Sequence, residues 1–143
     1  ELVPSTSFYN NVRSNVNKSE WDIIRKKCYK NANYKCEICG GVGEKHPVEC
    51  HEIWSYDDDK KIQKLEGLIS LCPDCHITKH IGLAKIQGRF DVALNKLCEV
   101  NEWNEDESLE YIEECFLKWN ERSEHIYDVD ISYLDEYLDY KLF

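Results

Sequence analysis

Long hydrophobic runs are absent from this chain. Its 143 residues contain no apolar stretch close to the ~18 residues that a membrane-spanning helix needs. The polar segment 1–17 also lacks the apolar core of a secretory signal peptide. These absences exclude a membrane partner from our expectations. The cysteine pattern described below indicates a reducing compartment and so favours a cytoplasmic protein.

Basic residues are scarce in the second part of the chain. Residues 99–143 contain 3 Lys and Arg against 15 Asp and Glu, a net charge of −12. Residues 1–98 contain 15 against 13, a net charge of +2. The first part can therefore approach a phosphate backbone, whereas the second would repel it. The acidic part suits solvated helix faces or a protein partner.

A disulfide framework is missing as well. The eight cysteines do not follow the spacing of a secreted disulfide scaffold. Four of them form two C-x-x-C pairs that are separated by 32 residues, namely Cys36, Cys39, Cys72 and Cys75. Two such turns can place four thiolates around one ion, which is the ligand set of a structural zinc site. Three further cysteines lie in helix-like segments, where we expect small buried apolar residues: Cys28, Cys98 and Cys115.

The hydrophobic periodicity predicts an α+β chain. Residues 1–18 are rich in Asn and Ser without a sustained period, and we expect a flexible arm. Ser19 predicts a helix N-cap, and this helix should end near residues 31–33. Two segments around a polar turn predict a β-hairpin over 47–71, and Pro73 predicts the start of a helix. Apolar stripes predict further helices at three places: from Phe90, over 106–122 and near 131–138.

Three histidines lie close to the cysteine pairs in the sequence. His51 belongs to the strand-like segment VECHEIW, while His76 and His80 belong to LCPDCHITKH and are one helical turn apart. Together with the two C-x-x-C pairs, this arrangement over residues 34–82 resembles the HNH endonuclease family. The resemblance implies a ββα-metal core held by the four-cysteine zinc. It also implies metal-dependent hydrolysis of DNA phosphodiester bonds.

The resemblance further implies residue roles. His51 matches the family's general base and His76 its final signature histidine, so both are candidate catalytic residues. Cys50, His76 and His80 match positions that hold a second divalent ion, which would be Mg²⁺, Mn²⁺, Ni²⁺ or Zn²⁺. Cys50 stands where the family has Asp or His, and a thiolate favours zinc or nickel over magnesium. Gly67 stands where the family has its middle Asn.

The polar neighbours of these residues allow other interpretations. Glu49 and Glu52 offer carboxylates, but strand alternation turns only one side of the strand toward His76. A ring that packs beneath the hairpin is the structural alternative for His51. Two other histidines show no partner and are expected in solvent: His46 and His125.

These patterns predict three regions. An arm over 1–18 precedes an HNH-like zinc domain with a leading helix over 19–88, and an acidic helical extension over 89–143 packs on that domain. The first predicted function, which the resemblance implies, is that of a metal-dependent HNH endonuclease that acts on DNA through its histidine base. The alternative is a non-catalytic zinc-binding module that binds nucleic acid, or a protein partner through the acidic extension. The net charge of −10 favours the alternative.

Overall fold

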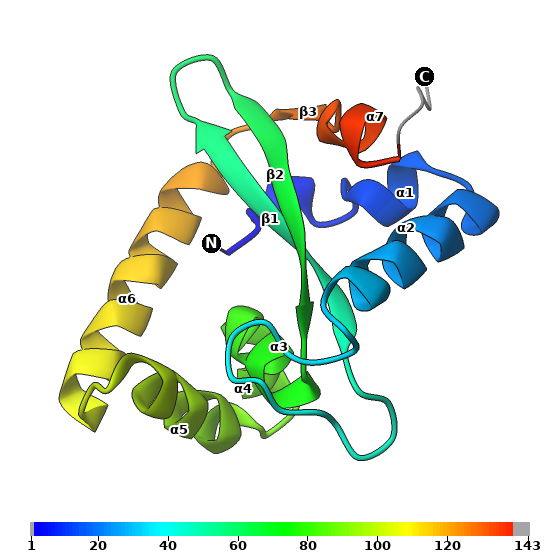
Figure 1. Ribbon diagram of the computed structural model, residues 1–143. Helices are drawn as coiled ribbons and strands as arrows, with labels where there is room; N and C mark the ends of the chain where they lie inside the picture. Colours follow the sequence, from blue (N-terminus) through cyan, green and yellow to red (C-terminus); the bar gives the residue numbers. More distant parts are fainter. Residues whose placement is uncertain (1, 139–143) are drawn as a thin grey trace.

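The computed structural model describes residues 2–138 (Figure 1). Within this range the chain has an α+β fold, with a three-stranded mixed sheet and seven α-helices. The elements in chain order are the 3₁₀ helix η1 (Ser5–Ser7), α1 (Val12–Asn15), α2 (Lys18–Asn31), β1 (Glu49–Asp57), β2 (Ile62–Leu71), α3 (Pro73–Lys79), α4 (Ile81–Ile86), α5 (Phe90–Asn101), α6 (Glu105–Arg122), β3 (Asp128–Asp130) and α7 (Tyr133–Tyr137). The expected α+β class, hairpin and following helices are confirmed.

Helix α2 begins two residues earlier than predicted. Asn17 is the N-cap, because its Oδ1 accepts the Glu20 backbone N–H at 2.9 Å while Glu20 Oε2 accepts the Asn17 N–H at 2.8 Å. This reciprocal pair is a capping box, which satisfies two N–H groups at the helix start. Ser19, the predicted N-cap, instead donates its hydroxyl to Asn17 Oδ1.

The N-terminal segment packs against the hairpin. Although we expected a flexible arm over 1–18, this segment holds η1 and α1, and Val12 is fully buried in a core with Ile24, Trp54 and Leu65. The Val12 N–H donates to Glu52 Oε1 at 3.1 Å, which ties the start of α1 to β1. Division of the chain at residues 18 and 88 stays a prediction.

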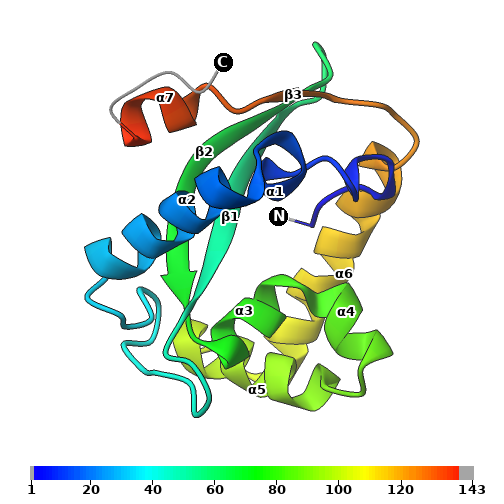
Figure 2. The ribbon, with the colours of Figure 1, turned by 90° about the vertical axis from the view of Figure 1, so that its right-hand side faces the viewer.

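The hairpin is the central element of the fold. β1 and β2 pair antiparallel from Glu49↔Leu71 to Asp57↔Ile62, with a register shift between Ile53 and Trp54. Strand β3 adds to β2 in parallel, a pairing that its three residues do not reveal in the sequence. Figures 1 and 2 show α3, α4 and α5 gathered beside the end of the hairpin where β1 begins and β2 ends.

The acidic C-terminal part contacts both the hairpin turn and the N-terminal segment. Arg122 Nε of α6 donates to Asp58 Oδ1 at 3.0 Å, and Trp119 Nε1 donates to the Val3 carbonyl at 2.9 Å. Asp58 of the hairpin turn therefore anchors α6. None of the helices among residues 2–138 combines the length and apolar character of a membrane span.

Candidate metal centres

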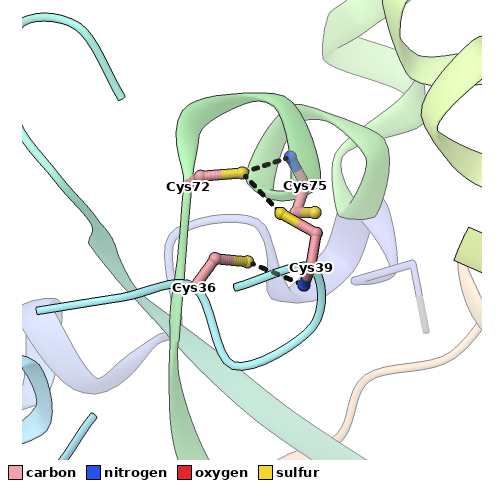
Figure 3. A group of neighbouring side chains, drawn as sticks. All are labelled: Cys36, Cys39, Cys72 and Cys75. Atoms are coloured by element: carbon pink, nitrogen blue, oxygen red, sulfur yellow. Dashed lines mark hydrogen bonds between the residues drawn. The ribbon is translucent and has the colours of Figure 1, made fainter. Parts of the chain in front are cut away.

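The four predicted zinc ligands converge at one point. Their sulfur atoms all lie within 4.8 Å of one another, and Cys39 Sγ and Cys72 Sγ are 3.6 Å apart. Figure 3 shows the four side chains pointing toward a common centre from two separate turns. One turn follows α2 and carries Cys36 and Cys39, whereas the other begins α3 and carries Cys72 and Cys75.

Backbone geometry shapes each cysteine turn. The Cys39 N–H points at Cys36 Sγ at 3.5 Å, and the Cys75 N–H points at Cys72 Sγ at the same distance. Cys72 is the N-cap of α3 and Pro73 follows at its first position, where a missing N–H costs nothing. Gly43 packs so closely that a Cβ there would lie 2.7 Å from Pro73 Cδ. A side chain at this position would clash both with the backbone oxygen of His46 in its own loop and with Pro73 of the second turn.

This cluster fits a structural zinc ion. Tetrahedral ligands at a Zn–S distance of about 2.3 Å have sulfurs about 3.8 Å apart, close to the observed 3.6 Å between Cys39 and Cys72. Three of the four cysteines are buried, which suits a closed site. Burial raises the pKa of the Cys36 thiol. Backbone N–H groups, first that of Cys39, lower the pKa by more than burial raises it, so that it falls to about 6. The turn thus supplies a thiolate near neutral pH.

A second group consists of three histidines. His51 comes from β1, His76 from α3, and His80 directly follows α3, with one ring nitrogen of each within 4.8 Å of the others. The ring centroids are 5.2 Å apart for His51 and His76, 5.1 Å for His51 and His80, and 4.7 Å for His76 and His80. The hairpin and the helix therefore present their histidines to one common space.

Glu49 orients His76 within this group. Its Oε2 lies 2.5 Å from His76 Nδ1, and its Oε1 lies 2.9 Å from His46 Nε2. An ionised carboxylate can only accept hydrogen bonds, so His76 Nδ1 and His46 Nε2 each carry a proton. His76 therefore has a lone pair on Nε2, which faces His80 Nε2 at 3.1 Å. His46 has a partner after all, contrary to the expectation from the sequence.

Cys50 does not join His76 and His80. Consecutive residues of a strand point to opposite faces, so His51 and Glu49 face α3 while Cys50 faces away. The Cys50 thiol instead interacts with Cys28 of α2. The structure therefore does not bring the predicted ligands Cys50, His76 and His80 together: the residue that lies beside His76 and His80 is His51.

Burial keeps His51 and His80 uncharged. It lowers the pKa of His51 to about 2 and that of His80 to about 4, and the neighbouring rings act in the same direction. Burial raises the pKa of Glu49, but its bonds to His76 and His46 outweigh this and hold the pKa below the ordinary range. Metal ligation requires neutral imidazoles, and His51 and His80 meet this condition.

The histidine group fits a second metal ion. Imidazole nitrogens suit Zn²⁺ or Ni²⁺ better than Mg²⁺, and a Zn–N distance of about 2.0 Å puts tetrahedral nitrogens about 3.3 Å apart. The 3.1 Å between the two Nε2 atoms is close to that value. Two or three imidazole ligands leave at least one position open for water or substrate, as a catalytic site requires. All three residues are half-buried, so solvent can reach the group.

Comparison with known proteins finds no family, curated protein or solved structure that matches this chain. The function of this chain is therefore inferred from its own geometry. It contains a four-cysteine cluster that could hold zinc and a three-histidine group that could hold another metal, both beside a β-hairpin. Sequence reasoning located both groups but missed the carboxylate bridge from Glu49 to two histidines.

Proposed function

We propose that this protein is a metal-dependent, HNH-type endonuclease that hydrolyses DNA phosphodiester bonds. The observation that carries the proposal is the convergence of a strand histidine, His51, with a helix-borne pair, His76 and His80. The adjoining four-cysteine cluster would hold structural zinc and fix the start of α3. The ββα-metal identity of this core is part of the same proposal.

Each histidine receives a separate role. His51 acts as general base and accepts a proton from the attacking water, a role that rests on its position beside His76 and His80. His76 and His80 hold the ion, and Glu49 keeps His76 in the tautomer that leaves Nε2 free. A divalent ion bound here would stabilise the charge that develops on the phosphate and the leaving oxygen.

The charge distribution supports a nucleic-acid substrate. Residues 1–98 carry a net charge of +2, in contrast to −12 in the remainder. Lys79 lies next to His80 and is exposed, and its charge acts on the buried ring of His51. A cation at this place suits a phosphate backbone that approaches the histidines.

Plasmid nicking tests the proposed activity. The zinc-loaded protein is incubated with supercoiled DNA and Mg²⁺, Mn²⁺, Ni²⁺ or Zn²⁺, beside the variants His51→Ala and His125→Ala. We expect cleavage with at least one ion, loss of cleavage in His51→Ala, and full activity in His125→Ala, because His125 lies exposed beyond α6. Absence of cleavage with all four ions would contradict the nuclease.

Metal titration separates the two roles that His51 could have. As a base, His51 is needed for cleavage but not for holding the ion. We therefore expect His51→Ala to retain second-site binding of Ni²⁺ while losing activity, and His76→Ala to lose both. A His51→Ala protein that no longer binds the second ion would identify His51 as a ligand and overturn its assignment as the base.

A non-catalytic zinc module is the second candidate. Gly67 stands where the related family has Asn, and the exposed face of α6 is strongly acidic, with Glu110, Glu113 and Glu114 all in solvent. Such a module would bind nucleic acid through the first part of the chain, or a protein partner through the acidic part. Metal stoichiometry distinguishes the candidates, because one zinc per chain without a second exchangeable ion favours the module.

A further inference from the structure

A pair of free cysteines lies behind the three-histidine group. Cys28 comes from α2 and Cys50 from β1. Cys50 is paired with Ser70 across the hairpin, and Cys28 Sγ is 3.2 Å from Ser70 Oγ. Opposite residues of antiparallel strands have their Cβ atoms about 4.5–5.5 Å apart. The Cys28 sulfur therefore lies beside the Cys50–Ser70 pair. Cys28 and burial raise the pKa of the Cys50 thiol, whereas Cys50 lowers the pKa of the Cys28 thiol.

The surrounding core holds this pair in place. Ile24 lies one helical turn before Cys28 and packs in the same cluster as Trp54, which is on the Cys50 side of β1. Figures 1 and 2 show α2 running alongside the hairpin. The Ser70 hydroxyl also donates to the Cys28 carbonyl at 3.0 Å, which fixes the helix against β2 at this level.

The two thiols differ in their access to solvent. Cys28 is only 3% exposed. Cys50 is half-buried and lines an open pocket of about 600 Å³ together with Arg13, Lys18 and Tyr29. A small oxidant that enters this pocket meets Cys50 first and finds Cys28 directly behind it. In redox-active cysteine pairs, an accessible thiol reacts with the oxidant and a neighbouring resolving thiol then forms the disulfide.

We propose that Cys28 and Cys50 form a redox-active pair that a peroxide converts to a disulfide between α2 and β1. The Cys50 sulfur attacks one peroxide oxygen, the O–O bond breaks, and the products are a sulfenic acid on Cys50 and one water. The Cys28 sulfur then attacks the Cys50 sulfur, an S–S bond forms, and the sulfenic oxygen leaves as a second water. Two thiols are oxidised and one peroxide is reduced.

The other cysteines provide internal controls. Zinc-bound thiolates in the four-cysteine cluster are engaged by the metal, so the experiment uses zinc-loaded protein. Cys98 is a matched control, because it is half-buried like Cys50 but has the hydroxyl of Ser108 beside it, at 3.1 Å, where Cys50 has a thiol. Its oxidation would stop at a sulfenic acid or continue up the oxidation ladder.

Non-reducing peptide mapping after treatment with hydrogen peroxide tests the pair. We expect a linked peptide that joins Cys28 to Cys50 and lacks two hydrogen atoms, in wild type and in Cys98→Ser. The linked peptide should be absent from Cys28→Ser, which should instead show oxidised Cys50. Wild-type protein in which Cys50 stays reduced, or stops at a sulfenic acid while Cys28 stays free, would overturn the proposal.

Thermal unfolding gives a second reading that does not depend on a variant. The new disulfide would close the chain between residues 28 and 50 and so restrict the unfolded state. We expect the oxidised wild-type protein to melt several degrees higher than the reduced protein, and a reductant to reverse the shift. An oxidised protein that carries the linked peptide but melts lower would show that the bond does not suit the native geometry.

Discussion

At the level of single residues, Glu49 connects two histidines through one carboxylate. One oxygen bonds His76 Nδ1 and the other bonds His46 Nε2. Carboxylates in this position raise the basicity of a ligating imidazole and fix its ring, and so act on the metal without touching it. The sequence could not assign this role, because the partners of Glu49 depend on how a loop and a helix fold back on the strand.

Glu49→Gln tests the role of this carboxylate. The amide keeps the size of the side chain but removes the charge, so His76 loses a strong acceptor. We expect the affinity of the histidine group for Ni²⁺ to fall roughly 10- to 100-fold, measured by isothermal titration of zinc-loaded protein. Glu44→Gln, at an exposed carboxylate of the preceding loop, is the matched control. Equal affinities in the two variants would show that His76 orients itself.

Gly43 has a comparable influence on the cysteine cluster. A Cβ at this position would lie 2.7 Å from Pro73 Cδ, much closer than packed carbons approach. At Gly67 the nearest atom, Ile53 Cδ1, would be 3.7 Å away, an ordinary contact. The two glycines therefore differ in the side chains that they permit.

Gly43→Ala should destabilise the contact between the two cysteine turns. Because overpacking of this kind displaces the backbone, we expect the free energy of unfolding to fall by about 1–3 kcal/mol, measured with urea in the presence of zinc. Gly67→Ala should change it much less. A Gly43→Ala protein as stable as wild type would mean that the turns can separate without cost.

The candidate sites show how far sequence reasoning extends. The spacing of Cys36, Cys39, Cys72 and Cys75 was sufficient to predict their cluster, because a C-x-x-C turn has local geometry. Cys50 was placed in the wrong group, since a motif match ignores the face on which a strand residue lies. Strand alternation alone states that Cys50 and His51 cannot both face α3. Only one of the two residues can face α3, and the structure shows that this residue is His51.

At the level of elements, the hairpin turn is tied to α6 by Asp58. Its carboxylate accepts from Arg122 at 3.0 Å and from the Tyr127 hydroxyl at 2.7 Å. The Arg122 bond, assisted by Tyr127, outweighs the effect of burial and lowers the pKa of Asp58 to about 2. This carboxylate therefore stabilises the folded state when it is ionised.

Asp58→Asn tests this tie and its pH dependence. The pKa of Asp58 is lower in the folded state than its ordinary 3.8, so its contribution is complete above about pH 4 and is lost as the pH falls toward 2. Because the side chain is 41% exposed, we expect Asp58→Asn to reduce the free energy of unfolding by only about 1 kcal/mol at pH 7. The difference should shrink in acid. Asp59→Asn, one residue along the exposed turn, should have no such effect in urea unfolding.

Short elements were beyond prediction for a physical reason. α1 has four residues and β3 has three, so neither can show a hydrophobic period. α1 forms because Asn11 caps it and Glu52 receives its first N–H. β3 forms because its backbone pairs with β2. The longer α5 and α6 were predicted closely, since twelve and eighteen residues suffice for an apolar stripe.

At the level of the whole molecule, α3 connects the two candidate metal centres. Cys72 caps this helix, Cys75 lies in its first turn, and His76 is the next residue. The histidine group thus requires that α3 start at the right place and angle against β1. The cysteine cluster does not depend on the histidines in this way, because its two turns contact each other at Gly43 and Pro73.

Removing one ligand from each centre should therefore have unequal effects. A structural zinc ion supplies roughly 10 kcal/mol of folding free energy, so Cys72→Ser should lose the tight zinc, melt far below wild type, and no longer bind Ni²⁺ at the histidine group. His76→Ala should lose Ni²⁺ binding but retain one tight zinc and nearly the wild-type melting temperature. Metal analysis after dialysis, combined with circular dichroism, measures both. A Cys72→Ser protein that still binds Ni²⁺ through its histidines would show that α3 holds its position without zinc, and the two centres would then be independent.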